Sequence, residues 1–297
     1  MSTKAPTLRQ FQDRFPTEET CLDHLMRVRF GDRHDCAKCG RNAHFYRVKA
    51  RRSYACEYCG HQVYPTAGTP FNRTRTSLRD WFYVMFLFTT TRNGVAAKRV
   101  ERELGVTYKT AWRMCDQIRE YMRQLDGDDP VGGDGVIVEI DETMIGGKLK
   151  FRRGDGKSRS QRQNKTLVMG FAERDGSVLT QIVPDNRKTS LVPEIVEHLA
   201  PGSICHTDSL HSYKSLPQMG FEHHTVNHCR GRYVGPPGVH VQTIEGFWGM
   251  VKRAINGTHI HVSGEHLPKY LGEFEYRWNM RQVPHLMLDR LMFSFVR

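Results

Sequence analysis

The chain has 297 residues, 38% of them hydrophobic, which is enough for one sizeable core with small accessory units. Its 44 Lys and Arg residues outnumber its 32 Asp and Glu residues, and the net charge of +12 predicts a polyanionic partner, with nucleic acid favoured over an anionic membrane. The longest apolar run, Trp81–Phe88, is too short to cross a bilayer, and the first residues lack the apolar core of a signal peptide. We therefore expect no membrane partner and a cytoplasmic location, where thiols stay reduced.

Four cysteines near the N-terminus form two C-x2-C pairs. Cys36 and Cys39 are followed, after sixteen residues, by Cys56 and Cys59. This spacing is typical of a tetrahedral Cys₄ zinc ribbon, and four thiolates leave no open coordination position, so the predicted Zn²⁺ is structural. The intervening hairpin carries four basic residues that favour contact with DNA over a purely protein–protein role: Arg47, Lys49, Arg51 and Arg52. We place the ribbon at about residues 30–66, within an N-terminal region of residues 1–70.

The next region, residues 71–126, is predicted to be helical. Ser77 is a suitable N-cap for an apolar helix that begins at Leu78. The following stretch has the rhythm of a helix–turn–helix with Leu104-Gly105-Val106 at its turn, although an ordinary helical hairpin is the alternative. Residues 127–135 are rich in Gly, Asp and Pro and are predicted to be a linker.

The second helix of a helix–turn–helix enters the major groove of DNA, and its early polar residues reach bases or phosphates. Lys109 and Arg113 lie early in this helix and are predicted to contact DNA. Trp112, between them, is expected to pack in the core.

Residues 136–297 alternate between strand and helix patterns and are predicted to form an α/β domain with a mixed sheet. Three strands come first, and Asp175-Gly176 makes the turn between the second and third. A helix, two further strands and a second helix follow. The expected strands are 136–140, 166–172, 178–183, 203–206 and 221–226, and the expected helices are 189–199 and a segment that starts near 245.

Three acidic residues lie at positions that suit a metal site, two of them after expected strands and one on an expected helix. Asp141 comes directly after the first expected strand, Asp208 comes after the fourth, and Glu245 lies on an amphipathic helix with Lys252 two turns later. Carboxylates from separate elements are the ligands that a pair of Mg²⁺ ions requires, and a lysine on the same face can hold a phosphate. Glu142, on the opposite face of the strand, is the alternative ligand.

Several other side chains lie next to these acids in the sequence. His206, His211, His240 and His259 are interpreted as structural, with proton transfer or phosphate binding as the alternative. Trp248 is expected to pack beneath the site, with stacking on a DNA base as the alternative.

The motifs resemble those of an insertion-sequence transposase of the IS1595 type, with an ISXO2-like DDE domain and an N-terminal zinc ribbon. The resemblance rests on the two CxxC pairs, IDETMIGGK at 140–148, HTDSLHSY at 206–213, HVQTIEGFWGMVKRAINGTH at 240–259 and KYLGEFEYRWNMR at 269–281. It covers almost the whole chain in the family order. One departure is Gln242, where relatives often have Asn, so a metal-assisting role for this position would need altered geometry.

What the resemblance implies is an RNase H-like fold, two Mg²⁺ ions (with Mn²⁺ as a substitute), and DNA strand cleavage followed by strand transfer. It makes Asp141, Asp208 and Glu245 the catalytic metal ligands and Lys252 their basic companion. The expected partner is double-stranded DNA, both the terminal inverted repeats of the element and its target, bound by a homo-oligomer in a prokaryotic nucleoid.

The segment Lys148–Lys165 carries eight basic residues and a single acid. We expect it to loop between the first two strands and to contact the DNA backbone through Arg152, Arg153 and Lys157; a solvated loop is the alternative. Arg253, beside Lys252, completes the predicted DNA-contacting set.

Two other functions fit the sequence less well. In a DNA-binding regulator the sheet domain would be catalytically inert, but such a domain has no reason to retain all three acids and Lys252. A structure-specific nuclease, such as a junction resolvase, could use the same fold. The ribbon and the helix–turn–helix favour recognition of particular element ends over DNA shape alone.

Overall fold

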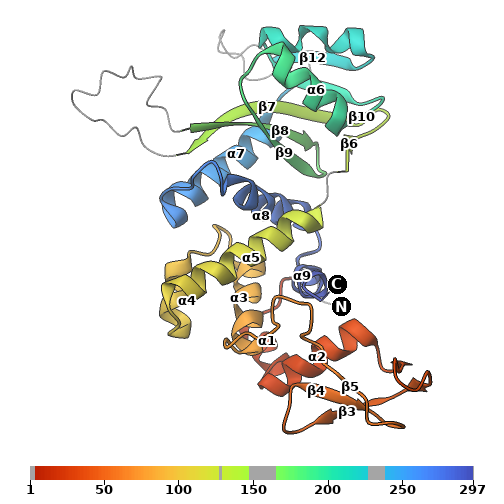
Figure 1. Cartoon of the computed structure of the whole chain (residues 1–297). Coiled ribbons are helices and arrows are strands. Elements are labelled where there is room, and N and C mark those ends of the chain that lie inside the picture. The colour runs from red at the N-terminus through yellow and green to blue at the C-terminus, as the bar shows by residue number, and fades with distance from the viewer. Residues whose placement is uncertain (1–3, 127–128, 147–164, 227–237, 297) are drawn as a thin grey trace. The chain divides into compact units, whose positions relative to one another are not determined.

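The computed structural model describes residues 4–126, 129–146, 165–226 and 238–296 (Figure 1). The chain divides into two compact units, Met1–Tyr121 with Gln282–Arg297 and Met122–Arg281. The finer domain boundaries expected from the sequence stay predictions. Within the described ranges, no helix has both the length and the apolar character that crossing a membrane requires.

The first unit begins with two short helices, each of which has a capping residue at its N-terminus. Helix α1 (Leu8–Arg14) follows Thr7 and α2 (Glu18–Phe30) follows Thr17, and each threonine forms a reciprocal capping box with the third residue of its helix. Next comes the ribbon, in which β1 pairs with β2 and β3, β4 and β5 form a second antiparallel sheet. The bounds are β1 His34–Asp35, β2 Asn42–Ala43, β3 Phe45–Val48, β4 Ser53–Cys56 and β5 Gln62–Val63.

Three helices complete the sequential part of this unit: α3 (Leu78–Thr90), α4 (Ala97–Leu104) and α5 (Tyr108–Asp126). Ser77 caps α3 by accepting a hydrogen bond from the Asp80 amide, as predicted. Gly105 ends α4 in a left-handed conformation at φ 66°, which favours glycine, and so makes the tight turn into α5.

The C-terminal residues return to this first unit. A short 3₁₀ helix, η5 (Pro284–Leu286), precedes α9 (Met287–Ser294). The ring of Phe295 then stacks on Phe71 and Tyr121 at centroid distances of 5.5 and 4.0 Å. The core of the first unit is therefore closed by the last residues of the chain.

The second unit is built on a five-stranded mixed sheet in the order β12-β11-β7-β8-β9. Strands β7, β8 and β9 pair antiparallel, while β11 runs parallel to both β7 and β12. This strand order gives the RNase H-like mixed sheet that the resemblance predicted. The bounds are β7 Ile137–Gly146, β8 Lys165–Glu173, β9 Val178–Val183, β11 Ile204–Asp208 and β12 Glu222–Val226.

Helices cover both faces of this sheet (Figure 1). Helix α6 (Lys188–His198) and η2 (His211–Met219) pack on one face, over a core that includes Ile140 and Phe171. Helices α7 (Gln242–Ala254) and α8 (Leu267–Asn279) pack on the other face, and a short π-helical segment, η4 (Ile255–His259), follows α7. A separate short parallel pair joins β6 (Val131–Gly132) to β10 (Leu199–Ala200).

The free edge of the sheet at β9 is partly occupied by a side chain. Asn279, at the end of α8, accepts a hydrogen bond from the Val178 amide through Oδ1 (2.7 Å) and donates one to the Val178 carbonyl through Nδ2 (2.9 Å). The side-chain amide thus makes both backbone hydrogen bonds that a neighbouring strand would make at this residue.

Candidate active site

Asp141 lies inside a strand and not at its end, which corrects the sequence-based expectation. The apolar run stops at Ile140, but β7 continues to Gly146 because it keeps pairing with β8, where Asp141 faces Gly170. What does end is the parallel pairing with β11, whose last pair is Thr207 with Ile140. Asp141 is therefore the first residue of β7 beyond that parallel neighbour.

Asp208 is the last residue of β11 and directly follows Thr207. Its Oδ1 accepts a hydrogen bond from the Leu210 amide at 2.9 Å, which holds the carboxylate at the start of the following turn. Because β7 and β11 run parallel, Asp141 and Asp208 both lie just past the point where these two strands stop pairing.

Glu245 and Lys252 come to the site from α7. Glu245 lies in the first turn of the helix and Lys252 in its last turn, and both side chains are exposed. The pKa of Asp141 is raised to about 6, first by burial and then by the negative charges of Asp208 and Glu245, while Lys252 acts in the opposite direction. The structure thus brings all four predicted residues within electrostatic reach of one another.

The distances between these carboxylates show how closely they are grouped without a metal ion. Across the part of the chain that the structure describes, the only groups of three or more potential ligands whose atoms all lie within 4.8 Å are the four ribbon cysteines and Glu194, Glu197 and His198. Asp141, Asp208 and Glu245 are spread more widely than that. Carboxylates from three separate elements are hard oxygen donors of the kind that divalent ions such as Mg²⁺ prefer.

Glu142 faces away from this cluster, as strand alternation predicts. The Tyr213 hydroxyl donates a hydrogen bond to it from η2, on the α6 side of the sheet. Burial and then the charges of Asp141 and Asp208 raise its pKa to about 8, so it is largely protonated near neutral pH. Its position on the opposite face of β7, where it is hydrogen-bonded to Tyr213, favours Asp141 over the alternative.

Helix α7 sits very close to the sheet at the position of Asp141. A Cβ atom at Gly170, which pairs with Asp141, would lie 2.5 Å from Cζ2 of Trp248 and 2.8 Å from Cδ1 of Ile244. The indole of Trp248 is buried in the core beneath the site, as expected from the sequence. The role of Gly170 was missed, and only the isolated glycine within the strand VMGFA hints at such a close approach.

The four histidines near the motifs differ in their surroundings. Nδ1 of His206 lies 3.3 Å from Arg174, and burial followed by that positive charge lowers the pKa of His206, which therefore accepts this hydrogen bond as a neutral ring. His240 approaches Glu139 at 3.1 Å, and His259 packs edge-on against Tyr270. These three are structural, whereas the side chain of His211 is exposed.

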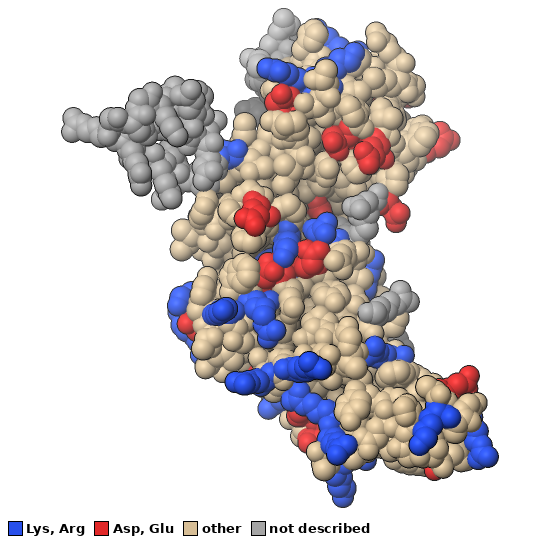
Figure 2. Space-filling view, in the orientation of Figure 1, with Lys and Arg blue, Asp and Glu red and all other residues tan. Residues whose placement is uncertain are grey.

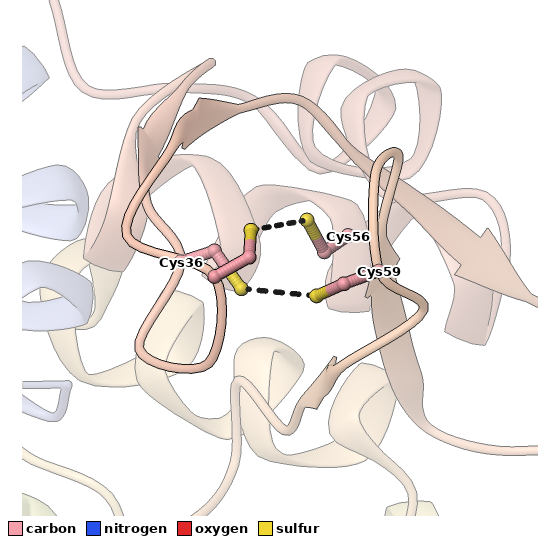
Figure 3. A group of neighbouring side chains, drawn as sticks. Cys36, Cys56 and Cys59 are labelled. Carbon is pink, nitrogen blue, oxygen red and sulfur yellow. Dashed lines mark hydrogen bonds between the residues drawn. The ribbon is translucent and has the colours of Figure 1, made fainter.

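The four ribbon cysteines converge in the first unit, and Figure 3 shows their side chains directed at one another. Sγ of Cys36 lies 3.5 Å from Sγ of Cys59, and Sγ of Cys39 lies 3.9 Å from Sγ of Cys56. Tetrahedral Zn–S bonds of about 2.3 Å require S···S separations of about 3.8 Å, so the cluster fits one Zn²⁺. The glycine after each pair, Gly40 and Gly60, adopts φ 68° and donates its amide back to Cys36 or Cys56.

The predicted DNA contacts on α5 are exposed. Lys109 and Arg113 both face solvent, and the guanidinium of Arg113 also lies 5.7 Å from the ring centroid of the buried Trp81. Trp112 is 38% exposed, so the expectation that it packs in the core is wrong. Its indole points to the outer side of α5 because residues such as Ala111, Met114 and Cys115 supply the buried face.

The remaining basic candidates divide into three groups. In the ribbon, Arg47 and Arg52 pair with Glu19 and Glu18 of α2, while Lys49 and Arg51 are exposed. Arg253 is exposed on α7, next to Lys252. Arg152, Arg153 and Lys157 lie outside the described residues. On the face drawn in Figure 2, Lys and Arg side chains gather over the first unit.

An RNase H-like sheet with three acids on one side, in a chain that also carries a four-cysteine ribbon, is the architecture expected of a transposase of the DDE class. Comparison with known families agrees, since an ISXO2-like transposase domain matches residues 131–279 and a transposase zinc-ribbon domain matches residues 16–62. The chain therefore belongs to the IS1595 family of insertion-sequence transposases.

Two proteins from other organisms are similar to this chain in sequence. A protein of the transposable element ISH50 from Halobacterium salinarum is 27% identical over 288 residues, which is 91% of this chain and 94% of the relative. A transposase-like protein from Haemophilus influenzae is 32% identical over 109 residues, which is 36% of this chain and 84% of the relative. Both names point to mobile elements.

Proposed function

We propose that this transposase binds the ends of its insertion sequence, cleaves DNA strands there in a metal-dependent reaction and transfers them to target DNA. The observation that carries the proposal is the electrostatic cluster of Asp141, Asp208 and Glu245, with Lys252 beside it, on one side of the RNase H-like sheet. The match to the ISXO2-like transposase domain supports it.

In this proposal each acid has a defined part. Asp141 and Asp208, on adjacent strands just past the last residue pair between them, would share one Mg²⁺. Glu245 with one of them would hold a second ion, and Mn²⁺ would substitute. Such a pair of ions would stabilise the charge that develops on the attacking and leaving oxygens of an in-line displacement. Water attacks phosphorus in cleavage and a 3′-hydroxyl attacks it in transfer, and in each case the opposite P–O bond breaks.

The basic residues would hold the DNA. Lys252, exposed on the same helix as Glu245, would donate to a phosphate oxygen next to the metals, and the exposed Arg253 would extend this positive surface. Lys109 and Arg113 would bind the terminal inverted repeats through α5, with the zinc ribbon as a second contact. Arg152, Arg153 and Lys157 are proposed to bind the backbone. A homo-oligomer holding two ends, located with the prokaryotic nucleoid in the cytoplasm, completes the proposal.

The test is strand cleavage and joining on DNA that carries both flanking ends of the encoding element, with and without Mg²⁺. The intact protein, Asp208→Ala and Glu265→Ala would be compared, because Glu265 is an exposed carboxylate of the same unit. Joined products that require Mg²⁺ and vanish only in Asp208→Ala are expected. Cleavage without joining would indicate a nuclease, and DNA binding without cleavage in any of the three proteins would indicate a regulator.

A further inference from the structure

Glu139 is a fully buried carboxylate two residues before Asp141 on the same strand face. Its Oε2 accepts hydrogen bonds from the backbone amides of Thr243 (2.6 Å) and Ile244 (3.1 Å), and its Oε1 accepts one from the Thr243 hydroxyl (3.0 Å). Thr243 and Ile244 are the second and third residues of α7. Glu139 therefore caps a helix that begins about a hundred residues later in the chain.

This cap matters because α7 has none of its own. Val241 occupies the N-cap position and makes no side-chain hydrogen bond. The first amides of a helix lack partners within the helix and carry the positive end of its dipole, so a buried carboxylate is a strong partner for them. Removing that carboxylate would leave buried amides unpaired in the turn that contains Glu245.

Arg174 connects the same carboxylate to the rest of the site. Its Nη2 lies 3.2 Å from Oε1 of Glu139, which pairs the buried charge. The guanidinium also donates to the carbonyl of Gly238 (2.8 Å), to the carbonyl of His240 (3.3 Å) and to Nδ1 of His206 (3.3 Å). One side chain thus links β7, the residues that lead into α7, and β11.

The members of this network share one relationship to the acids. Glu139 stands two residues before Asp141, His206 two residues before Asp208, and Thr243 two residues before Glu245. On the strands, a separation of two keeps both side chains on the same face. The network therefore joins the three elements that carry the acids, in each case two residues before the acid in the sequence.

We propose that Glu139 and Arg174 are positioning residues that fix the start of α7 against β7 and β11, so that Glu245 meets the same metal ions as Asp141 and Asp208. This inference rests on the proposed function for its metal-binding consequence. In this role Glu139 contacts neither the metal ions nor DNA. Its effect is on the affinity of the site, because groups that orient metal ligands typically contribute about 10-fold to 100-fold to that affinity.

The experiment compares the full zinc-loaded chain with Glu139→Gln by two measurements that do not depend on DNA. Mn²⁺ binding is followed by the electron paramagnetic resonance signal of the free ion, and amide hydrogen exchange is followed by mass spectrometry across the first turn of α7. The matched control is Glu173→Gln. The Glu173 carboxylate accepts hydrogen bonds from the amides of Gly132 (2.7 Å) and Ser177 (2.9 Å), away from the acids.

We expect Glu139→Gln to weaken Mn²⁺ binding at least about 10-fold and to speed exchange in the first turn of α7, while Glu173→Gln changes neither. Unchanged exchange in that turn, or faster exchange with unchanged Mn²⁺ affinity, would overturn the proposal. If the intact chain binds no Mn²⁺ outside the ribbon, the proposed function fails, and the exchange measurement alone decides whether Glu139 fixes α7.

A milder variant keeps the inference testable if Glu139→Gln does not fold. Thr243→Val removes the hydroxyl that donates to Glu139 but leaves both backbone amides and the carboxylate in place. A several-fold loss of Mn²⁺ affinity with an unchanged melting temperature is the expected result. Equal Mn²⁺ affinity in Thr243→Val and the intact chain would count against the network.

Discussion

Asp141 and Asp208 lie on the neighbouring parallel strands β7 and β11. Each acid is one residue beyond Ile140 and Thr207, the last residue pair that joins these two strands. Burial and then the charge of Asp208 raise the pKa of Asp141 to about 6. Backbone pairing holds the two strands side by side, so the two carboxylates stay near each other. Without a cation, the site therefore costs the protein stability.

The first prediction is that Asp141→Asn stabilises the metal-free protein at pH 7. The folded-state pKa of about 6 exceeds the ordinary value of 3.8, so the folded state binds the proton more tightly and the contribution of Asp141 to stability falls as pH rises through this range. Removing the charge should raise the free energy of unfolding of the second unit by at most about 3 kcal/mol.

Calorimetry without added Mg²⁺, at pH 7 and at pH 4, measures this effect. The gain should disappear at pH 4, where Asp141 is protonated in the intact chain, and Mg²⁺ should stabilise the intact chain more than the variant. Asp134→Asn, at an exposed position, is the control. Destabilisation by Asp141→Asn at pH 7 would contradict the prediction.

The second prediction concerns acid stability of the first unit. The pKa of His24 is lowered to about 4, mainly by burial among Phe15 and Phe82 and then by the charge of Arg14. Because the unfolded chain takes up this proton near pH 6.5 and the folded chain does not, stability present above pH 6.5 is lost as pH falls toward 4.

Replacing His24 by Leu should therefore flatten the pH dependence of the unfolding free energy, by up to about 3 kcal/mol between pH 7 and pH 4. Urea titrations at several pH values measure it. Phe71→Leu, which weakens the packing of the same unit against Trp81 and Phe295, should lower stability equally at all pH values. Parallel profiles for His24→Leu and the intact chain would refute this account.

The third prediction is that Gly170→Ala impairs catalysis with every acid still present. The new Cβ would collide with Cζ2 of Trp248, so α7 must move from the sheet at the position of Asp141 or the core must absorb about 1–3 kcal/mol of strain. Trp248→Phe removes the colliding indole atoms and leaves the contact with Cδ1 of Ile244, which is the end of a flexible side chain. The double variant should regain strand cleavage relative to Gly170→Ala, and a further loss in the double variant would exclude this explanation.

The fourth prediction is that the ribbon folds only with its metal. Cys39→Ser should abolish the one tightly bound Zn²⁺ per chain, measured by atomic absorption, and remove amide protection from β3 to β5. Cys21→Ala is the control, because burial raises the pKa of this thiol to about 12 and it lies outside the cluster. A protected ribbon without zinc would contradict the prediction.

The fifth prediction concerns the contact of helix α5 with DNA. Lys109→Ala should weaken binding to element ends and reduce the slope of log affinity against log salt by about one, since one phosphate contact is lost. Lys188→Ala, an equally exposed lysine on α6, should bind normally. Fluorescence anisotropy at several salt concentrations measures both, and equal slopes for the two variants would remove Lys109 from the interface.

Much of this architecture could be predicted from local patterns. The strand patterns predicted all five strands of the sheet, and the C-x2-C spacing predicted the cysteine cluster. Buried apolar residues explain this for β8, whereas β12, with the sequence EHHTV, is mostly polar and only partly buried. The length of β7 could not be predicted in this way. Its continuation past Asp141 depends on hydrogen bonds to β8, which polar residues make as well as apolar ones.

Contacts between distant segments were also out of reach. The hydrogen bonds from Thr243 and Ile244 to Glu139 span more than a hundred residues, and nothing in either segment alone specifies them. The same holds for Trp112, whose exposure depends on which face of α5 the rest of the unit covers. The association of α9 with the first unit depends on the packing of Phe71 and Tyr121 against Phe295.

The side chain of Asn279 at the β9 edge has a consequence for assembly. By satisfying both backbone groups of Val178, it leaves no hydrogen-bonding partner there for a strand from another molecule. A strand from another molecule that paired with β9 would therefore have to displace the Asn279 side chain at this position.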